Sequence, residues 1–251
     1  MIPCRKTIHS ANDELSALRE KVHALANKER AAGSMRFFKT GPGEYGEGDK
    51  FLGLTVPQIR SLVRMGDALN EAGLLSLLHS EWHEERLLAM FILARWFTNA
   101  KGDEREQKQV VDLYLANTKC VNNWDLVDSS APYILGPWLF RRGRGILAKL
   151  AASSCLWEQR IAVLATFAFI REGEFSDTLR LCKSLLTHPH DLMHKACGWM
   201  LREAGKRDVA TLRAFLDENA PQMPRTMLRY AIEKLPEKER LRYLAVKRNP
   251  G

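Results

Sequence analysis

The stretches EWHEERLLAMFILARW at residues 81–96 and LWEQRIAVLATFAFIR at residues 156–171 decide the fold. Each begins with a charged turn next to a tryptophan and continues as an apolar segment with the spacing of a buried helix. The two tryptophans lie 75 residues apart, and the arginines Arg86 and Arg160 lie 74 residues apart. Such self-similarity within one chain is typical of a structural repeat.

Further segments share this layout of a turn, a polar residue and an apolar helix. They are HDLMHKACGWMLREAG at 190–205, QMPRTMLRYAIEKLP at 222–236 and, between the first two, NNWDLVDSSAPYILG at 122–136. We take one residue near the start of the second helix of each pair as an equivalent position, which gives Arg86, Asp128, Arg160, Lys195 and Arg225. Their spacings, between 30 and 42 residues, are similar to the irregular two-helix period of HEAT-type repeats. We expect these positions to line up along the concave face as a basic stripe with one carboxylate, Asp128, in the middle.

Helical spacing runs through nearly the whole chain, whereas alternating strand patterns are almost absent. The sequence therefore predicts an all-α fold, a HEAT-like repeat α-solenoid of about six helix pairs with a concave basic face. It predicts one domain over residues 1–251, with loose termini at 1–14 and 247–251. The predicted helices are 13–31, 57–65, 71–79, 84–97, 104–116, 124–140, 144–152, 157–171, 175–186, 191–204, 208–218, 223–235 and 237–246.

The charge balance favours a polyanionic partner. The 251 residues include 38 Lys and Arg against 30 Asp and Glu, a net charge of +8. A basic excess of this kind is common in proteins that bind nucleic acid. No apolar run is long enough to span a bilayer and no secretory signal is visible, so we expect a cytoplasmic protein, nucleoid-associated if it is bacterial, with no membrane contact. The five cysteines form no C-x-x-C pair and are expected to be reduced thiols.

Residues 37–60, FFKTGPGEYGEGDKFLGLTVPQIR, contain a G-x-G-x-x-G pattern. The dinucleotide-binding form of this motif needs a strand before it, but here a helical pattern precedes it and Pro42 interrupts it. Two interpretations stay open. The segment is a flexible loop between helices, or it is a loop whose backbone N–H groups and Tyr45 contact phosphate or sugar.

Histidines occur at spacings that can chelate a metal. His188, His190 and His194 form one group, and His79 and His83 form an i,i+4 pair. No acidic third ligand accompanies them as in H-E-x-x-H, so we expect cap and surface residues and no metal site.

Trp124 and Asp128 are separated by four residues and share a face of their predicted helix, while Leu126 and Val127 turn towards the core. The ordinary interpretation is a packed aromatic residue and a carboxylate stabilised near a helix start. The alternative is functional. Together with Trp199 of a later repeat, these side chains could enclose a cationic group.

Cleavage of an N-glycosidic bond suits that arrangement. Positive charge develops on the sugar in the transition state, and one carboxylate can stabilise it. A purine alkylated at N3 or N7 is already a cation and leaves as a neutral molecule, so no general acid has to protonate it. No second carboxylate occupies an equivalent repeat position.

The segments 37–60, 122–139, 156–175 and 194–208 together resemble the DNA alkylation repair family, the AlkD-like DNA glycosylases. They contain the combination W-D-x-V-D, then W-x-x-R, then G-W-x-L-R-E. The resemblance covers roughly residues 15–245. It implies a HEAT-like α-solenoid that removes alkylated purines, of the 3-methyladenine and 7-methylguanine type, from duplex DNA in base excision repair. It implies no metal and no organic cofactor.

By match to the family motif, Asp128 resembles the catalytic carboxylate and Trp124 the aromatic residue that packs against the deoxyribose. Arg160 resembles the arginine that fixes the lesion-side phosphate, Trp199 the second aromatic wall, and Tyr45 a loop residue at the DNA backbone. We add Lys195 and Arg225, from the basic repeat positions, as DNA-binding residues. Thr55 and Ala168 depart from the glutamine and lysine of relatives, which affects secondary DNA contacts and lesion preference.

Two other functions remain open. Solenoids are most often scaffolds, so a non-catalytic protein that binds DNA structures or an acidic protein is the main alternative. Asp128 argues against it, because a carboxylate in a polyanion groove repels phosphate. A nuclease would need clustered carboxylates for metal, and the predicted groove supplies only Asp128. We expect a monomer.

Overall fold

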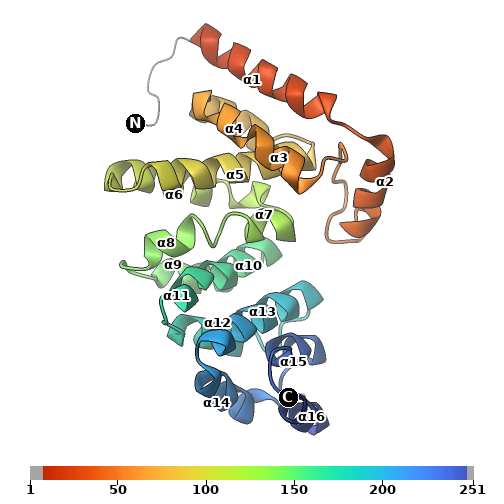
Figure 1. The fold of residues 1–251 in the computed structure, drawn as a ribbon, viewed down its shortest axis with the longest axis vertical. Coiled ribbons are helices and arrows are strands. Elements are labelled where there is room, and N and C mark those ends of the chain that lie inside the picture. Colours follow the sequence, from red (N-terminus) through yellow and green to blue (C-terminus); the bar gives the residue numbers. More distant parts are fainter. Residues whose placement is uncertain (1–7, 248–251) are drawn as a thin grey trace. The chain divides into compact units, whose positions relative to one another are not determined.

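A computed structural model describes residues 8–247 of the chain, with side chains from residue 13 onward. The described residues are helical almost throughout and contain no strand, only one isolated bridge between Lys50 and Trp82 (Figure 1). The predicted all-α fold is therefore confirmed. No helix of the described part is long and apolar enough to cross a membrane. Cys120, Cys155, Cys182 and Cys197 are free thiols, and Cys4 lies outside the described residues.

The chain divides after Ser130 into two compact units. The first contains α1 (Ile8–Ala24), α2 (Lys28–Phe37), α3 (Val56–Leu62), the 3₁₀ helix η1 (Val63–Ala68), α4 (Glu71–Leu78), α5 (His83–Asn99), α6 (Glu104–Ala116), the 3₁₀ helix η2 (Thr118–Cys120) and α7 (Trp124–Asp128). The second contains α8 (Leu135–Leu139), α9 (Gly145–Ala151), α10 (Leu156–Ala165), α11 (Phe167–Arg171), α12 (Ser176–Ser184), α13 (Asp191–Arg207), α14 (Val209–Asn219), α15 (Arg225–Ile232) and α16 (Glu237–Ala245).

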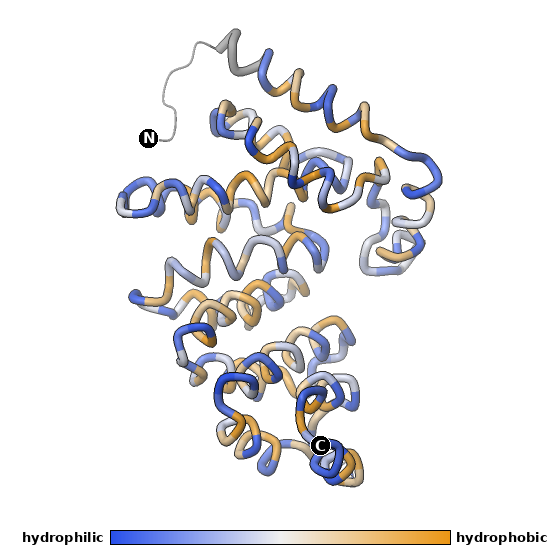
Figure 2. The backbone as a smooth tube through the Cα atoms, in the orientation of Figure 1, coloured by the Kyte–Doolittle hydropathy of each residue, from blue (hydrophilic) through white to orange (hydrophobic). Residues whose placement is uncertain are grey.

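Helix α5 is the centre of the first unit. It packs against α3, η1, α4, α6 and α7, and its residues are buried from His83 to Leu93. Its segment 87–93 is apolar on all sides, and such a helix has to lie inside a protein, which explains its central place. By contrast, hydrophilic and hydrophobic residues alternate along α1, which covers the unit with one face only (Figure 2).

Helix α13 has the same role in the second unit, where it packs against α10, α12, α14 and α15. Gly198 lets α15 approach closely, because a Cβ atom at this position would lie 2.6 Å from the carbonyl oxygen of Met227. Apolar side chains of both helices, including Met200, Leu201 and Leu228, are fully buried.

Four predicted helices are divided in the structure. The segment 57–65 runs from α3 into the 3₁₀ helix η1, and 157–171 forms α10 and α11. The segment 13–31 forms parts of α1 and α2, because Asn27 is extended and its side chain caps α2 by accepting from the N–H of Arg30. The segment 124–140 forms α7 and α8, because Pro132 supplies no N–H and restricts the residue before it. Residues 8–14, expected to be loose, belong to α1, while 1–7 and 248–251 lie outside the described residues.

A buried carboxylate fixes the loop that follows α2. Glu84, the second residue of α5, is 3% exposed and accepts from the backbone N–H groups of Leu52, Gly53 and Leu54 at 2.9, 2.7 and 3.2 Å. Gly53 has a φ of 85°, and a Cβ atom there would lie 2.2 Å from the carbonyl oxygen of Asn27. Only glycine fits this position, because the loop and the start of α2 touch through their backbones.

We therefore expect Gly53→Ala to lower the free energy of unfolding by about 2 kcal/mol or more, because it adds both a strained φ and a backbone clash. The matched control is Gly102→Ala, where φ is 97° but no atom lies within 4 Å of the added Cβ. Urea denaturation of the three proteins measures the difference. Equal losses in the two variants would mean that φ alone, and not the close approach, requires glycine at residue 53.

Candidate functional site

The five-residue helix α7 carries two of the predicted site residues on one face. Asn123 caps it, and its side-chain oxygen accepts from the N–H of Trp124 at 2.8 Å. Leu126 and Val127 are fully buried, as predicted, so Trp124 and Asp128 are left half-buried on the other side. The prediction that Asp128 lies near a helix start is wrong, because it is the last residue of α7. The helix dipole therefore does not explain this carboxylate.

A buried phenol, that of Tyr114, interacts electrostatically with Asp128. Tyr114 of α6 is completely buried and its hydroxyl lies 3.0 Å from Oγ of Ser130. Burial raises the pKa of Tyr114 well above its usual value, the hydrogen bond with Ser130 partly opposes this, and the negative charge of Asp128 adds to it, so the phenol stays neutral. Ser130 in turn donates to the carbonyl of Leu126, which ties the end of α7 to α6.

Trp124 packs against aromatic rings of its own unit. The ring of Phe38 stacks on Trp124 with 5.2 Å between centroids, and Phe37 meets it edge-on at 5.9 Å. Phe38 also stacks on Phe51 at 5.0 Å, and Phe51 stacks on the imidazole of His83 at 4.5 Å. A continuous set of stacked rings thus connects Trp124 to the first residue of α5.

His83 lies at the centre of a buried polar network, although the sequence predicted a cap or surface residue. Its Nδ1 is 3.0 Å from Oδ2 of Asp49 and its Nε2 is 2.8 Å from Oδ2 of Asp125. Asp49 also accepts from Arg86, which is 5% exposed. Arg86 was predicted to line the basic face, and this is wrong, because its guanidinium is buried against Asp49 and the carbonyl of Ser80.

The two carboxylates determine the charge of His83. Burial alone would lower its pKa, but the nearby charge and hydrogen bonds of Asp125 and Asp49 outweigh burial and raise the pKa to about 9. Burial would raise the pKa of Asp49, yet the bonds from His83 and the charge of Arg86 hold it below its usual value. At neutral pH His83 is therefore an imidazolium that donates to both carboxylates.

The glycine-rich segment forms turns between α2 and α3, with no strand before it. Gly43 and Gly48 have positive φ angles of 77° and 80°, which suits a tight loop. Tyr45 is half-buried and its hydroxyl donates to the carbonyl of Phe37 at 3.4 Å. This context does not fit a dinucleotide motif, and contact of Tyr45 with a nucleic-acid backbone stays a prediction.

The other predicted residues belong to the second unit, and two of its arginines bond to the backbone. Arg160 of α10 is 4% exposed and donates to the carbonyl of Leu192 at 2.8 Å. Arg225 donates to the carbonyls of Leu244 and Val246, both at 3.1 Å. The prediction of a stripe of basic side chains open to solvent is therefore wrong at Arg160, because its guanidinium lies inside the unit.

Trp199 and Lys195 lie on α13. Trp199 is half-buried, with its ring 6.2 Å from that of Phe167 and its indole N–H 3.1 Å from Glu203. The side chain of Lys195 is 40% exposed and pairs with Asp191 at 2.8 Å. Trp199, Lys195 and Arg225 are thus only partly buried, whereas Arg160 is buried.

Histidines at the start of α13 act as local caps, as predicted. His190 is the N-cap of this helix, and its Nδ1 accepts from the N–H of Leu192. His188 accepts from the N–H of His190, and His194 lies 2.6 Å from the carbonyl of His188. Within the described part of the chain, no group of three or more His, Cys, Asp or Glu side chains could hold a metal ion.

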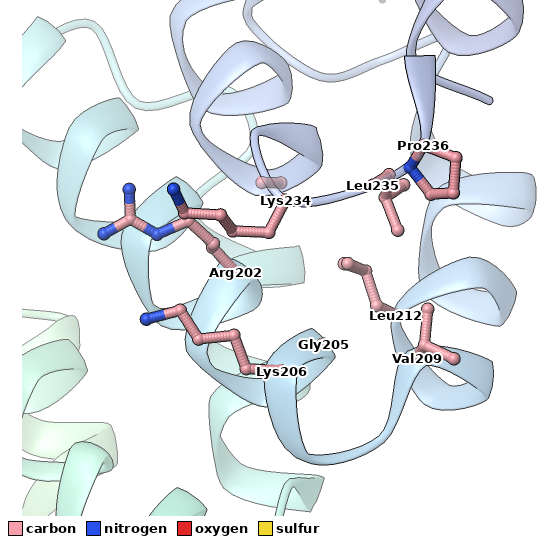
Figure 3. A pocket seen from close by; sticks show the side chains of 9 residues that line it. Arg202, Gly205, Lys206, Val209, Leu212, Lys234, Leu235 and Pro236 are labelled. Carbon is pink, nitrogen blue, oxygen red and sulfur yellow. The ribbon is translucent and has the colours of Figure 1, made fainter. Parts of the chain in front are cut away.

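A pocket of about 200 Å³ lies among α13, α14 and the segment after α15 (Figure 3). Leu212 and Leu235 form part of its apolar lining, and Arg202, Lys206 and Lys234 stand along one side. Each of these three cations pairs with a carboxylate, either that of Glu203 or that of Glu233. Three cations thus share two carboxylates, which leaves one positive charge in excess beside the pocket. None of the predicted site residues lines it.

The charge of His83 predicts a loss of stability in alkali. Because its pKa in the folded protein is raised above the value of 6.5, the imidazolium stabilises the fold fully below pH 6.5, and this contribution disappears as the pH rises through about 9. The difference between a pKa of 6.5 and a pKa of about 9 corresponds to roughly 3 kcal/mol in the free energy of unfolding. The free energy of unfolding of the wild type, minus that of His83→Gln, should therefore fall by this amount between pH 6 and pH 10.

The control is His79→Gln, since His79 is exposed and contacts a neutral partner, Asn117. Its difference from the wild type gives the effect of replacing a histidine that lies outside the buried network. Urea denaturation at a series of pH values measures both differences. A His83 difference that is constant over this range would show that His83 is neutral in the folded protein.

With this geometry established, comparison with known proteins identifies the chain. A family model described as "DNA alkylation repair enzyme" matches residues 18–235. A solved structure described as a predicted DNA alkylation repair enzyme from Enterococcus faecalis is similar over 84% of this chain and 97% of its own, with a TM-score of 0.65 and 15% identity. That likeness shows the fold, the HEAT-like helical solenoid class. No curated protein sequence matches. Because the family model spans most of the chain, the protein belongs to the DNA alkylation repair enzyme family, and its role is in the repair of alkylated DNA.

Proposed function

We propose that the protein is a DNA glycosylase that hydrolyses the N-glycosidic bond of cationic N3- and N7-alkylated purines in duplex DNA. The observation that carries the proposal is the arrangement of α7. Trp124 and Asp128 share one half-buried face of a short helix whose other face is fully buried. Membership of the DNA alkylation repair family makes alkylated DNA the substrate that this face would receive.

The reaction needs one carboxylate. Water attacks C1′ of the sugar, the bond from C1′ to the base nitrogen breaks, and its electron pair neutralises the cationic base, which leaves. The proton of the water passes to solvent or to Asp128. Asp128 stabilises the positive charge on the sugar or aligns the water, and the ring of Trp124 holds the sugar in place.

Residues of the second unit would contact the DNA in this proposal. Lys195 is the simplest case, because its ammonium is exposed and a phosphate could replace Asp191 as its partner. Trp199 offers a partly exposed ring. A phosphate contact by Arg160 requires the guanidinium to leave the carbonyl of Leu192, so we assign it first to holding α13.

Asp128→Asn tests the chemistry. The amide keeps the shape of the side chain but removes its charge, so release of 7-methylguanine and 3-methyladenine should slow by about 10²-fold or more. Binding to undamaged duplex should be unchanged or slightly tighter, because one repulsion against phosphate is removed. Single-turnover release of free bases, assayed in EDTA and beside a thermal melt, measures this effect. The matched control is Asp112→Asn, at an exposed carboxylate of the same unit.

Each contrary result has a definite meaning. If Asp128→Asn releases bases as fast as the wild type, the catalytic assignment is wrong. If the wild type loses activity in EDTA and magnesium restores it, the protein is a metal-dependent enzyme. If the wild type binds duplex DNA but releases no base from methylated DNA, the non-catalytic binding function is correct.

Lys195→Ala tests the DNA contact of the second unit. Affinity for duplex DNA should fall steeply with salt, and the slope of log K against log salt should flatten by about 0.9 when one phosphate contact is lost. Lys108→Ala is the control, because Lys108 also forms an exposed i,i+4 pair with an aspartate. Fluorescence anisotropy over a salt series measures the slopes. An unchanged slope for Lys195→Ala would remove this residue from the interface.

A further inference from the structure

The helix that carries Trp124 and Asp128 cannot hold its own position. It has five residues, and isolated helices of this length are unstable in water. Its place is set by contacts from its buried side. One of these is the bond between Asp125 and Nε2 of His83, which joins α7 to the start of α5 at 2.8 Å.

His83 reaches the same helix by a second path. Its imidazole stacks on Phe51 at 4.5 Å and lies 4.9 Å from the ring of Phe38. Phe38 stacks on Trp124, so movement of the imidazole would displace the rings that support the indole. The two paths start from one side chain that is 2% exposed, and they end at adjacent residues of α7.

The groups that face His83 come from three elements. Asp49 belongs to the loop after α2, Asp125 belongs to α7, and Arg86 on α5 itself acts through its ion pair with Asp49. Asn123 adds a neutral donor, 3.4 Å from Oδ2 of Asp49. Two carboxylates facing one ring require N–H groups on both of its nitrogens, so only the imidazolium satisfies both contacts.

We propose that His83 is a positioning residue for the site on α7, and that its protonated form holds Trp124 and Asp128 in their reactive arrangement. For its effect on activity, this inference rests on the proposed glycosylase function. The effect on the position of Trp124 does not depend on that function. His83 itself touches neither DNA nor the reacting atoms in this mechanism.

Loss of the proton breaks one of the two contacts. A neutral imidazole donates through one nitrogen and accepts through the other, so either tautomer places a lone pair against a carboxylate. The ring or the carboxylate then moves, and α7 moves with it. Because the pKa of His83 is about 9, the change falls within a range where the DNA phosphates do not titrate. Base release by the wild type should therefore have an alkaline limb that His83→Gln lacks.

The first measurement follows Trp124 directly. The indole ¹H–¹⁵N signal of Trp124, assigned with Trp124→Phe, is recorded from pH 7 to pH 10. In the wild type it should shift with a midpoint near the pKa of His83, about 9. In His83→Gln it should not titrate. In His79→Gln, the exposed control, it should titrate as in the wild type. An indole signal that is constant with pH in the wild type overturns the proposal.

The second measurement follows base release over the same pH range in single turnover. The wild-type rate should fall by about tenfold or more across the limb, since small displacements at a reactive site have large effects on rate. The DNA concentration at half-saturation should change less than twofold, because His83 is buried away from the surface. His83→Gln should be slow at pH 7.5 and flat in alkali. A flat wild-type profile overturns the catalytic part of the proposal.

Asp125→Asn provides a second variant in case His83→Gln does not fold. It keeps an oxygen that can accept from Nε2 but removes the charge that contributes most to the raised pKa of His83. The alkaline limb and the indole titration should both move to lower pH. If neither the alkaline limb of base release nor the midpoint of the indole titration moves, the contact between His83 and Asp125 does not control the position of α7. If no protein releases bases but the indole titrations behave as expected, the glycosylase function fails and the positioning role of His83 stands.

Discussion

Four consecutive charged residues at the start of α5 are buried, and the first unit is organised around them. They are His83, Glu84, Glu85 and Arg86, each no more than 5% exposed. Charges inside a protein destabilise it unless each one is paired and hydrogen-bonded. Their partners lie on α1, in the loop between Asp49 and Leu54, and on α7, so burying the start of α5 requires all three of these parts to be in place.

The partners of these four charged residues show which parts of the first unit are linked to the start of α5. Glu84 binds the backbone of the loop at 52–54, and Glu85 accepts from Arg19 and lies 2.9 Å from His23, both of α1. The other two charges connect the loop at Asp49 with α7. The position of the candidate site on α7 therefore depends on the same ionic contacts that keep α1 and the loop in place. Stability and site geometry should respond together to changes in this network.

The internal repeat has a structural cause. Its basic residues suggested a surface for binding DNA, but the repeated feature is a turn before a buried helix. Before α5, α10 and α13, the N–H of the N-cap residue donates to a side chain two residues earlier. Those side chains belong to Ser80, Ser153 and His188, and they form local turns that lead into a buried helix. Arg86 and Arg160 follow these turns and donate to backbone carbonyls. Arg86 therefore holds the turn before its own helix and the loop at Asp49, and Arg160 holds the start of α13. Partly exposed lysines such as Lys195 remain as candidates for phosphate contact.

Sequence periodicity alone determined the helical class, because burial of one helix face leaves a pattern that can be read without the fold. It also placed Trp124 and Asp128 on one face and Leu126 and Val127 in the core, which depends only on the geometry of a single turn. The residues quoted for the family resemblance lie within the match that the family model confirmed.

Only the tertiary structure decided which charged residues are buried. The neighbouring sequence does not distinguish the buried His83 from the exposed His79. His79 directly follows the apolar helix α4, and His83 begins the apolar helix α5. The difference arises because Asp49 and Asp125, 34 and 42 residues away, fold against His83. Long-range pairing of this kind leaves no periodic signal in the sequence, so the network behind the candidate site became visible only when the helices were placed together.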